Sequence, residues 1–430
     1  MRSVWIFSTR ITFIALCFML ITGCNSSSAT TKTVQTPTPL HLTSYPWKSI
    51  SLPITGSPLL SYTVSPIDSK TVYACTGGAS IDLWETHNAG QHWFAIPLPT
   101  TPGTNCSFSI STSQPQRIAL LVNEASDNQR PCDRDTLYLS ADSGGTWKHI
   151  THTSIAPAQA KNGYCTITTT AHSLYIWYSY GGGQNTPQLS LLERTDNNGT
   201  TWSRADTAFG PGKLFFPPQV GKGENLAISV RNASDVSDIS ASLWMSHNAG
   251  RSWQRMGALP SQAGIFLLTT PQQGSSWPTQ AAPFYALVDE QIPSNLYALR
   301  TFESINGREW FAIPPLPTTR TTEAHPGLLQ SLSVTADGHL LIFGVNPKIG
   351  MPASVGIGQK PMTTFWLWSW NTHTDRWQVL SSPLTHAADE GCGLCWNGQL
   401  SSNLDHTRIL SVYHWQDKNS FFRMQLPDLA

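Results

Sequence analysis

The side chains that could carry out chemistry in this chain are a scattered set of carboxylates. Hydrolysis of a glycosidic bond needs two carboxylic acids on one cleft, one to donate a proton and one to attack or to activate water. The acids that fall near the ends of predicted strands, where they could reach such a cleft, are Glu124, Asp289, Glu290, Asp389 and Glu390. Because solvated carboxylates are common in surface loops, we assign no catalytic residue to this set.

Arginines form the second group, because a guanidinium binds a ligand carboxylate through two parallel hydrogen bonds. Arg130, Arg134 and Arg231 are the arginines expected on the same side of the molecule as the acids. The first two share one loop with several aspartates, which partly neutralise them. We therefore predict a ligand site that includes Glu124, Arg134, Arg231, Asp289 and Glu290.

Metal and cofactor chemistry has little support in the sequence. His87 and His247 are isolated, and the chain contains no HExxH motif. The pair Cys392-Gly-Leu-Cys395 could be a redox motif or half of a zinc site, but no second CxxC accompanies it. We predict neither a metal nor a cofactor, and interpret this pair as a local disulfide.

The remaining cysteines also indicate disulfides. After Cys17 and Cys24 are set aside, an even number remains: Cys75, Cys106, Cys132, Cys165, Cys392 and Cys395. Disulfides form outside the cytoplasm, although six cysteines allow 15 pairings. From their positions we predict the pairs Cys75–Cys106, Cys132–Cys165 and Cys392–Cys395. Such bonds either hold a binding surface in shape or serve stability alone.

The N-terminus predicts the compartment. Arg2 and Arg10 precede a short apolar run, Ile11 to Ile21, that is too short to cross a membrane, which needs about 20 residues. A charged start, an apolar run and small residues are typical of a signal peptide. Ile21-Thr22-Gly23-Cys24 resembles the bacterial lipobox, which implies cleavage before Cys24 and lipidation of that residue. An ordinary signal peptide with a chance cysteine is the alternative.

Three regions follow from this reading. Residues 1–23 are the lipoprotein signal peptide, residues 24–45 are a Ser/Thr/Pro-rich tether, and residues 46–430 are the folded domain. Without Arg2 and Arg10 the chain has 24 basic and 26 acidic residues. Because no basic stripe is present, we predict no nucleic-acid partner. We expect an extracytoplasmic monomer that meets the membrane through its lipid.

An internal repeat positions the candidate residues. Four segments align without gaps: Thr86–Trp93, Ser140–Trp147, Thr195–Trp202 and Ser246–Trp253. Two weaker copies are Ser304–Trp310 and Asn371–Trp377. The hydroxyl and the Asp or Asn of each copy can accept hydrogen bonds from turn N–H groups, and the glycine supplies a positive φ. The tryptophan is expected to pack between neighbouring sheets with its N–H near a partner. These residue types at this spacing predict a β-hairpin turn and not an enzyme active site.

The spacing of the repeats predicts the architecture. Successive tryptophans from Trp93 to Trp377 are 54, 55, 51, 57 and 67 residues apart, which suits one four-stranded antiparallel blade each. Only three strands are expected after Trp377, one fewer than a blade needs. The missing outer strand is found at the N-terminus, where residues 46–50 (Pro-Trp-Lys-Ser-Ile) match residues 146–150 (Thr-Trp-Lys-His-Ile) at the start of another outer strand. We therefore predict an all-β, seven-bladed β-propeller whose ring is closed by the N-terminal strand. Long loops at 125–135, 181–188, 232–241 and 346–363 are expected on the face opposite the repeat turns.

The repeat resembles the Asp-box (BNR) pattern Ser/Thr-x-Asp-x-Gly-x-Thr-Trp, found in sialidases and other propellers, and we call each copy a box. Sialidases also carry a Phe/Tyr-Arg-Ile-Pro motif, whereas this chain has Phe94-Ala-Ile-Pro97 and Phe311-Ala-Ile-Pro314. The missing arginine argues against sialidase activity. The repeats are similar, too, to those of the propeller-shaped photosystem II assembly factor, although its arginine-rich face is not evident. These resemblances are at fold level.

The sequence thus favours a membrane-anchored binding or scaffold protein, with a cell-surface, glycan or protein ligand at the loop-bearing face. An exo-sialidase or other glycoside hydrolase is the alternative.

Overall fold

The computed structural model describes a β-rich molecule. All the described residues belong to the compact unit Leu40–Ala430. The structure describes residues 48–49, 59–65, 68, 70–77, 80–98, 103, 105–111, 113–123, 135–157, 163–181, 189–215, 218–221, 224–232, 241–259, 265–269, 283–292, 296–314, 329–334, 340–345, 362–371, 374–379, 384–387, 396–402, 408–414 and 421–426. No helix in this part of the chain is long and apolar enough to cross a membrane.

The described strands form seven antiparallel sheets of four or five strands. The first sheet contains β2 (Leu59–Val64), β3 (Val72–Thr76), β4 (Asp82–Thr86) and β5 (Phe94–Ile96). The second contains β6 (Asn105–Ile110), β7 (Ile118–Asn123), β8 (Thr136–Ser140) and β9 (Lys148–Ile150). The third contains β10 (Tyr164–Thr169), β11 (Leu174–Tyr180), β12 (Leu189–Thr195) and β13 (Ser203–Arg204), followed by a 3₁₀ turn, Thr207–Phe209.

The remaining sheets repeat this strand order. The fourth contains β14 (Lys213–Phe215), β15 (Gln219–Val220), β16 (Leu226–Asn232), β17 (Ala241–Ser246) and β18 (Gln254–Ala258). The fifth contains β19 (Ile265–Thr269), β20 (Phe284–Ile292), β21 (Leu296–Ser304) and β22 (Phe311–Ala312). The sixth contains β23 (Leu329–Val334), β24 (Leu340–Val345), β25 (Met362–Asn371), β26 (Arg376–Val379) and β27 (Leu384–Ala387). The seventh contains β28 (Trp396–Ser402), β29 (Arg408–His414), β30 (Phe421–Leu426) and β1 (Lys48–Ser49).

β6 ends at Ile110, which lies opposite Ile118 at the start of β7, and beyond this pair the Ser111 N–H donates to the Arg117 carbonyl oxygen.

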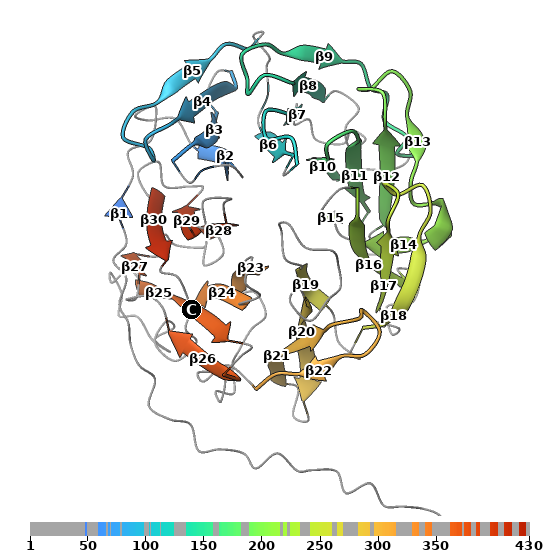
Figure 1. Cartoon of the computed structure of the whole chain (residues 1–430), viewed down its shortest axis with the longest axis vertical. Helices are drawn as coiled ribbons and strands as arrows, with labels where there is room; N and C mark the ends of the chain where they lie inside the picture. The colour runs from blue at the N-terminus through green and yellow to red at the C-terminus, as the bar shows by residue number, and fades with distance from the viewer. Residues whose placement is uncertain are drawn as a thin grey trace, which may run out of the picture. The chain divides into compact units, whose positions relative to one another are not determined.

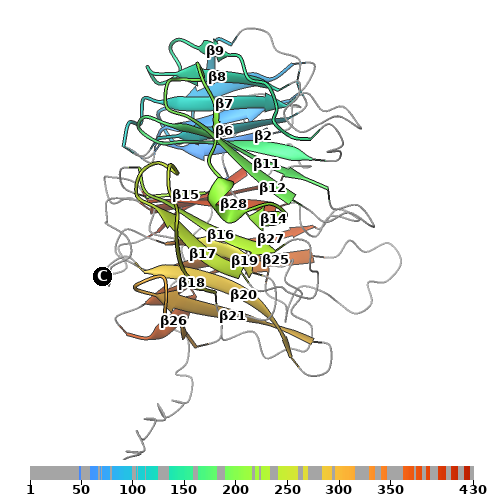
Figure 2. The same cartoon turned by 90° about the vertical axis from the view of Figure 1, so that its right-hand side faces the viewer.

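The sheets follow one another in chain order around a common centre (Figure 1), and their strands run from one face of the unit to the other (Figure 2). Neighbouring sheets pack face to face through apolar side chains. Leu121 and Leu139 of the second sheet, for example, share one buried cluster with Ile176 of the third. Similar buried clusters join the first sheet to the second, the third to the fourth, the fourth to the fifth, and the fifth to the sixth. The core therefore consists of layers between sheets.

Two ends of each sheet are named by their connections. At the box end, the third strand turns into the fourth through a box. At the loop end, the second strand connects to the third. Because β1 pairs antiparallel with β30, with Lys48 opposite Arg423, it occupies the place of a fourth strand in the seventh sheet.

Candidate functional site

The boxes have the geometry that the sequence predicts. In the second box, the Ser140 hydroxyl accepts a hydrogen bond from the Gly144 N–H at 2.8 Å, and Asp142 Oδ1 accepts one from the Thr146 N–H at 2.8 Å. Gly144 has a φ of 93°, as expected, and the preceding Ser143 has a φ of 59° as well. The side chains of Ser140, Asp142 and Thr146 all form hydrogen bonds within the turn, so this box has a structural role.

The box tryptophans pack between sheets, as predicted. Trp147 packs against the cluster that joins the first and second sheets, and Trp202 against the next one. Their N–H groups differ from the expectation. The Trp253 indole N–H donates to the Ala205 carbonyl oxygen at 2.6 Å, whereas those of Trp147, Trp202 and Trp310 are buried without a hydrogen-bond partner in the described part of the chain.

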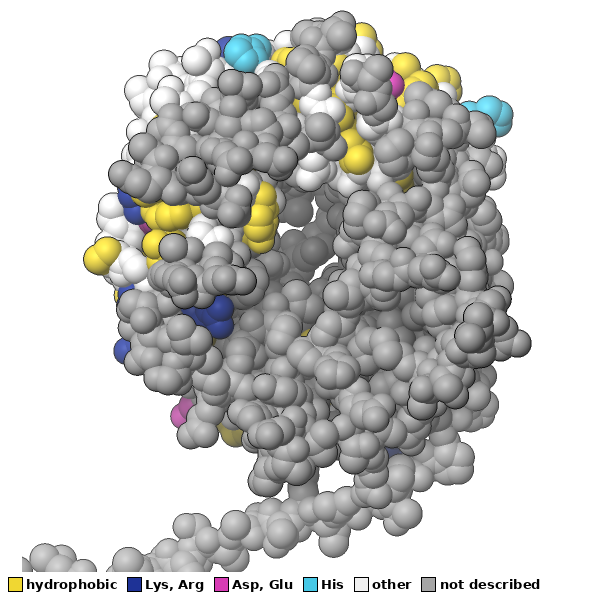
Figure 3. Space-filling model, turned by 180° about the vertical axis from the view of Figure 1, so that it is seen from behind, with side chains coloured by type: hydrophobic (Ala, Val, Ile, Leu, Met, Phe, Trp, Pro, Cys, Tyr) yellow, Lys and Arg dark blue, Asp and Glu magenta, His cyan; other side chains and the backbone are white. Residues whose placement is uncertain are grey.

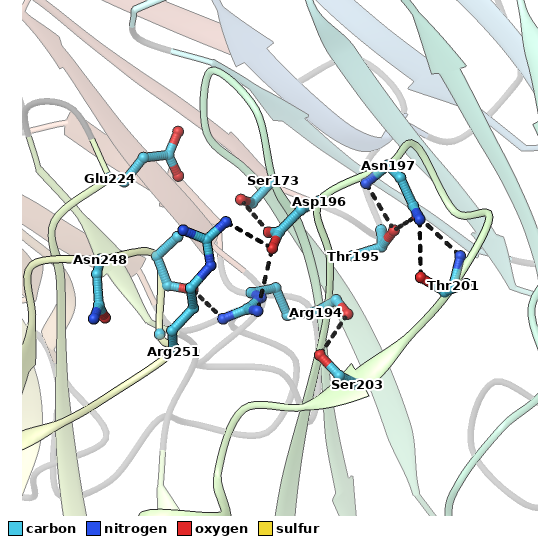
Figure 4. Close-up of polar contacts among 12 residues, drawn as sticks. Ser173, Arg194, Thr195, Asp196, Asn197, Thr201, Ser203, Glu224, Asn248 and Arg251 are labelled. Carbon is cyan, nitrogen blue, oxygen red and sulfur yellow. Dashed lines mark hydrogen bonds and ion pairs between the residues drawn. The ribbon is translucent and has the colours of Figure 1, made fainter.

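Polar residues also connect consecutive boxes at the box end (Figure 4). Asp196 of the third box accepts a hydrogen bond from the Ser173 hydroxyl at 2.8 Å. Asp196 Oδ2 also forms ion pairs with two arginines. It lies 3.2 Å from Nη2 of Arg194 and 3.0 Å from Nη2 of Arg251, which belongs to the fourth box. Partial burial alone would raise the pKa of Asp196, but Ser173, Arg251 and Arg194 together lower it below the ordinary value. The Asp196 carboxylate therefore links the third and fourth sheets. Because it already has three partners, it has few free lone pairs with which to bind a ligand.

A second polar cluster lies between the second and third sheets. The Tyr178 hydroxyl donates to Glu193 Oε2 at 2.5 Å, and His152 Nε2 lies 2.9 Å from both oxygens. Burial and the neighbouring Glu193 strongly raise the pKa of Tyr178. A tyrosine–glutamate pair is a nucleophile arrangement in sialidases, but Tyr178 is 0% exposed and Glu193 3% exposed. A substrate cannot reach a pair buried in this way.

The loop end offers an exposed aromatic side chain. Tyr164 begins β10, the first strand of its sheet, and is 54% exposed. Its ring meets the buried Trp177 ring edge to face, with centroids 5.4 Å apart. The Trp177 indole N–H donates to the Phe215 carbonyl oxygen of the fourth sheet at 2.9 Å, and Ser190 binds both backbone groups of Phe215. The exposed ring therefore rests on a support that is fixed by two sheets.

Two cationic side chains lie near this end on opposite faces of the fourth sheet. Lys213 is half-buried and shares its strand face with Phe215, which packs toward the third sheet. Arg231 pairs with Leu214 and Ala241, so its side chain is on the other face. Burial lowers the pKa of the Arg231 guanidinium, and among the described residues no carboxylate pairs with it.

The structure places only part of the predicted ligand set. Glu124 and Arg134 lie outside the described residues, but their neighbours Asn123 and Asp135 are joined by a 2.6 Å hydrogen bond. Asp289 and Glu290 are on β20, opposite Leu299 and Ala298 of β21, with only their backbone described. Asp389, Glu390 and Arg130 also lie outside the described residues.

One predicted disulfide is present: Cys75 and Cys106 are bonded, with their Cα atoms 6.7 Å apart, and connect the first and second sheets. Cys165 is also disulfide-bonded. Its predicted partner Cys132 lies outside the described residues, as do Cys24, Cys392 and Cys395. Within the described part of the chain, no three His, Cys, Asp or Glu residues are grouped so as to hold a metal ion.

Sequence reasoning did not identify Tyr164, Trp177, Tyr178, Glu193 or His152 as members of a cluster. Tyr164 had one usable signal, because it directly precedes a cysteine at the loop end of a first strand. His152 had none, because its partners are 26 and 41 residues away in the chain.

Comparison with known proteins supports the fold. No protein-family model matches the sequence, and no curated protein matches it. A solved structure described as YCF48 bound to D1 peptide is similar to this chain, with a TM-score of 0.51 and 13% identity, over 90% of this chain and all of that one. YCF48 from Cyanidioschyzon merolae gives a TM-score of 0.49 and 11% identity, over 88% and 98% of the two chains. A fungal fucose lectin with a six-bladed β-propeller gives 0.40 and 10% identity, over 80% and 100%.

The likeness to YCF48 bound to D1 peptide, together with the antiparallel sheets, supports a β-propeller fold. At such low identity, this likeness shows the fold alone.

Proposed function

We propose that this chain is a lipid-anchored, extracytoplasmic binding or scaffold protein that holds its ligand at the loop end. In this proposal the seven sheets are the seven blades of the propeller, and β1 closes the ring as the outer strand of the seventh blade. The strand order β1-β30-β29-β28 supports this closure, because it repeats the order of the other sheets.

The observation that carries the proposal is the exposed Tyr164 ring on its fixed support. An aromatic face that is held in place can stack on the apolar face of a sugar or on a side chain of a protein ligand, with little loss of conformational freedom. Lys213, at the loop end of the neighbouring sheet, supplies a hydrogen-bond donor. Figure 3 shows that the face turned away in Figure 1 is hollowed near its middle, with hydrophobic and basic side chains beside the hollow.

The glycoside hydrolase alternative has weaker support. It needs two accessible carboxylates on one cleft. Among the described residues the best placed acid, Glu193, is buried behind Tyr178 and His152. The carboxylate clamp of a sialidase needs several converging arginines, and Arg231 is the one predicted member whose place is described.

Binding and turnover can be separated directly. Mature protein should be applied to a glycan array and to a panel of fluorogenic glycosides that includes a sialoside. We expect array binding that falls at least tenfold in Tyr164→Ala and is unchanged in Phe94→Ala, whose side chain has the same exposure at the box end. Turnover of a sialoside that is lost in Arg231→Ala would contradict the proposal and favour the hydrolase.

The lipid anchor has its own test. A Cys24→Ala variant should leave the membrane fraction or remain unprocessed. If it stays processed and membrane-bound like the unmodified chain, lipidation at Cys24 is wrong.

A further inference from the structure

Most of the exposed apolar side chains among the described residues lie at the box end, whereas the loop-end connections 124–134, 182–188, 233–240 and 346–361 lie outside the described residues. In the described part of the chain, four large hydrophobic side chains are exposed: Phe94 (54%), Tyr164 (54%), Ile305 (44%) and Phe311 (56%). Tyr164 is the one at the loop end. The other three are at the box end, where Phe94 and Phe311 begin the outer strands β5 and β22 and Ile305 lies in the fifth box.

The two phenylalanines occupy equivalent positions. Phe94 lies opposite Glu85, and Phe311 lies opposite Glu303, in the third strand of each sheet. The isoleucine two residues later is buried in both sheets. Each strand is thus packed on the core while the phenylalanine that begins it stays in contact with solvent. Because they belong to the first and fifth sheets, the two rings are separate apolar points at the same end of the molecule and not one contiguous patch.

The direction of β1 places the start of the tether at the same end. Lys48 pairs with Arg423 and Ser49 with Phe422, so the chain before Lys48 meets the sheet beside the Leu426 end of β30. In the sheets that contain a box, this end of the third strand is the box end. The chain therefore enters β1 from the box end of the seventh sheet. With roughly 20 residues, such a tether spans about 25 Å as a flexible coil.

We propose that the box end is a membrane-docking surface, on which Phe94, Ile305 and Phe311 contact the lipid interface while Tyr164 faces away. The inference rests on the lipid anchor of the proposed function. A short tether keeps the box end close to lipid, and aromatic side chains are favourable at the boundary between headgroups and acyl chains. The ligand surface is then presented to the outside of the cell.

The test uses full-length, lipidated protein in vesicles of phosphatidylethanolamine and phosphatidylglycerol that contain an alkyne-bearing phospholipid. The photo-crosslinking residue p-benzoylphenylalanine replaces Phe94, Phe311 or, as the matched control, Tyr164. These three side chains have nearly equal exposure in the structure. After irradiation, lipid adducts are counted on the protein. We expect at least tenfold more adduct at positions 94 and 311 than at position 164.

Equal adduct yields at the three positions, a higher yield at 164, or crosslinked pairs of chains instead of lipid adducts would overturn the proposal. Positions 94 and 311 lie in different sheets, so each checks the other if one substitution impairs folding. The Cys24→Ala fractionation separates the two proposals. If that variant leaves the membrane while adduct yields are equal, only the docking surface is wrong; if it stays membrane-bound, both are wrong.

Discussion

Arg251 donates a hydrogen bond to Asp196 across the boundary between two sheets, with Nη2 and Oδ2 3.0 Å apart. The two residues belong to consecutive boxes. The box is therefore a local turn that also carries contacts from one blade to the next.

The Asp196–Arg251 pair should contribute measurably but weakly to stability. We expect a double-mutant cycle of Asp196→Ala and Arg251→Ala to give a coupling free energy of about 0.5 kcal/mol, because both side chains are partly exposed and solvent screens their attraction. Urea unfolding measures it. A cycle of Asp196→Ala with Arg255→Ala, an exposed arginine of the same sheet, should give no coupling. Equal coupling in both cycles would contradict a specific contact.

Asp142 should make stability depend on pH in the acid range. Hydrogen bonds from the side chain of Thr146, then from its backbone and from Ser140, lower the pKa of Asp142 to about 2. Because the folded pKa is below the unfolded value of about 4, this stabilisation is complete above pH 4 and is lost as pH falls toward 2.

An Asp142→Asn variant, with the residue that the first, third and fourth boxes carry, should remove this part of the pH dependence. The variant should be less stable than the unmodified protein at pH 7, and the difference should shrink toward pH 2. Unfolding midpoints at several pH values measure this. Parallel pH profiles for the two proteins would show that the carboxylate makes no such contribution.

The buried Tyr178 hydroxyl should matter for stability more than for binding. Tyr178→Phe leaves Glu193 and His152 buried with one partner fewer, at a cost of about 1–3 kcal/mol. Tyr180→Phe, two residues along the same strand and half-buried, should change the free energy of unfolding by less than about 0.5 kcal/mol. Denaturant unfolding compares the two variants. Similar losses in both would mean that the Tyr178–Glu193–His152 cluster is not specific.

The Cys75–Cys106 bond closes a loop with a sequence separation of 31 residues. Cys75→Ser combined with Cys106→Ser should destabilise the protein by about 3–4 kcal/mol, chiefly through the greater freedom of the unfolded chain. Thermal unfolding measures this loss. Peptide mapping without reductant should recover the Cys75–Cys106 pair, and six free thiols in the mature protein would contradict the disulfide framework.

Deleting residues 46–53 should expose the edge of β30. We expect loss of cooperative unfolding or aggregation, because an unpaired strand edge invites pairing with other chains. Light scattering and thermal unfolding test this. A truncated protein with the melting behaviour of the full chain would show that β1 is not needed to close the propeller.

The sequence by itself determined the local hairpins. Hydroxyl, Asp or Asn, glycine and tryptophan at fixed spacing specify a turn whose hydrogen bonds lie within a few residues, as Ser140 and Asp142 show. The all-β class and propeller architecture follow from repetition of this unit.

The tertiary structure alone decided which side chains meet across sheets. Tyr178, Glu193 and His152 come together, and Tyr164 gains its Trp177 support, through strand register and through the faces that neighbouring sheets turn to each other. Period-two alternation tells which residues share a face, but not which residue of the next sheet lies opposite. That choice depends on long-range packing, which no local pattern in the sequence specifies.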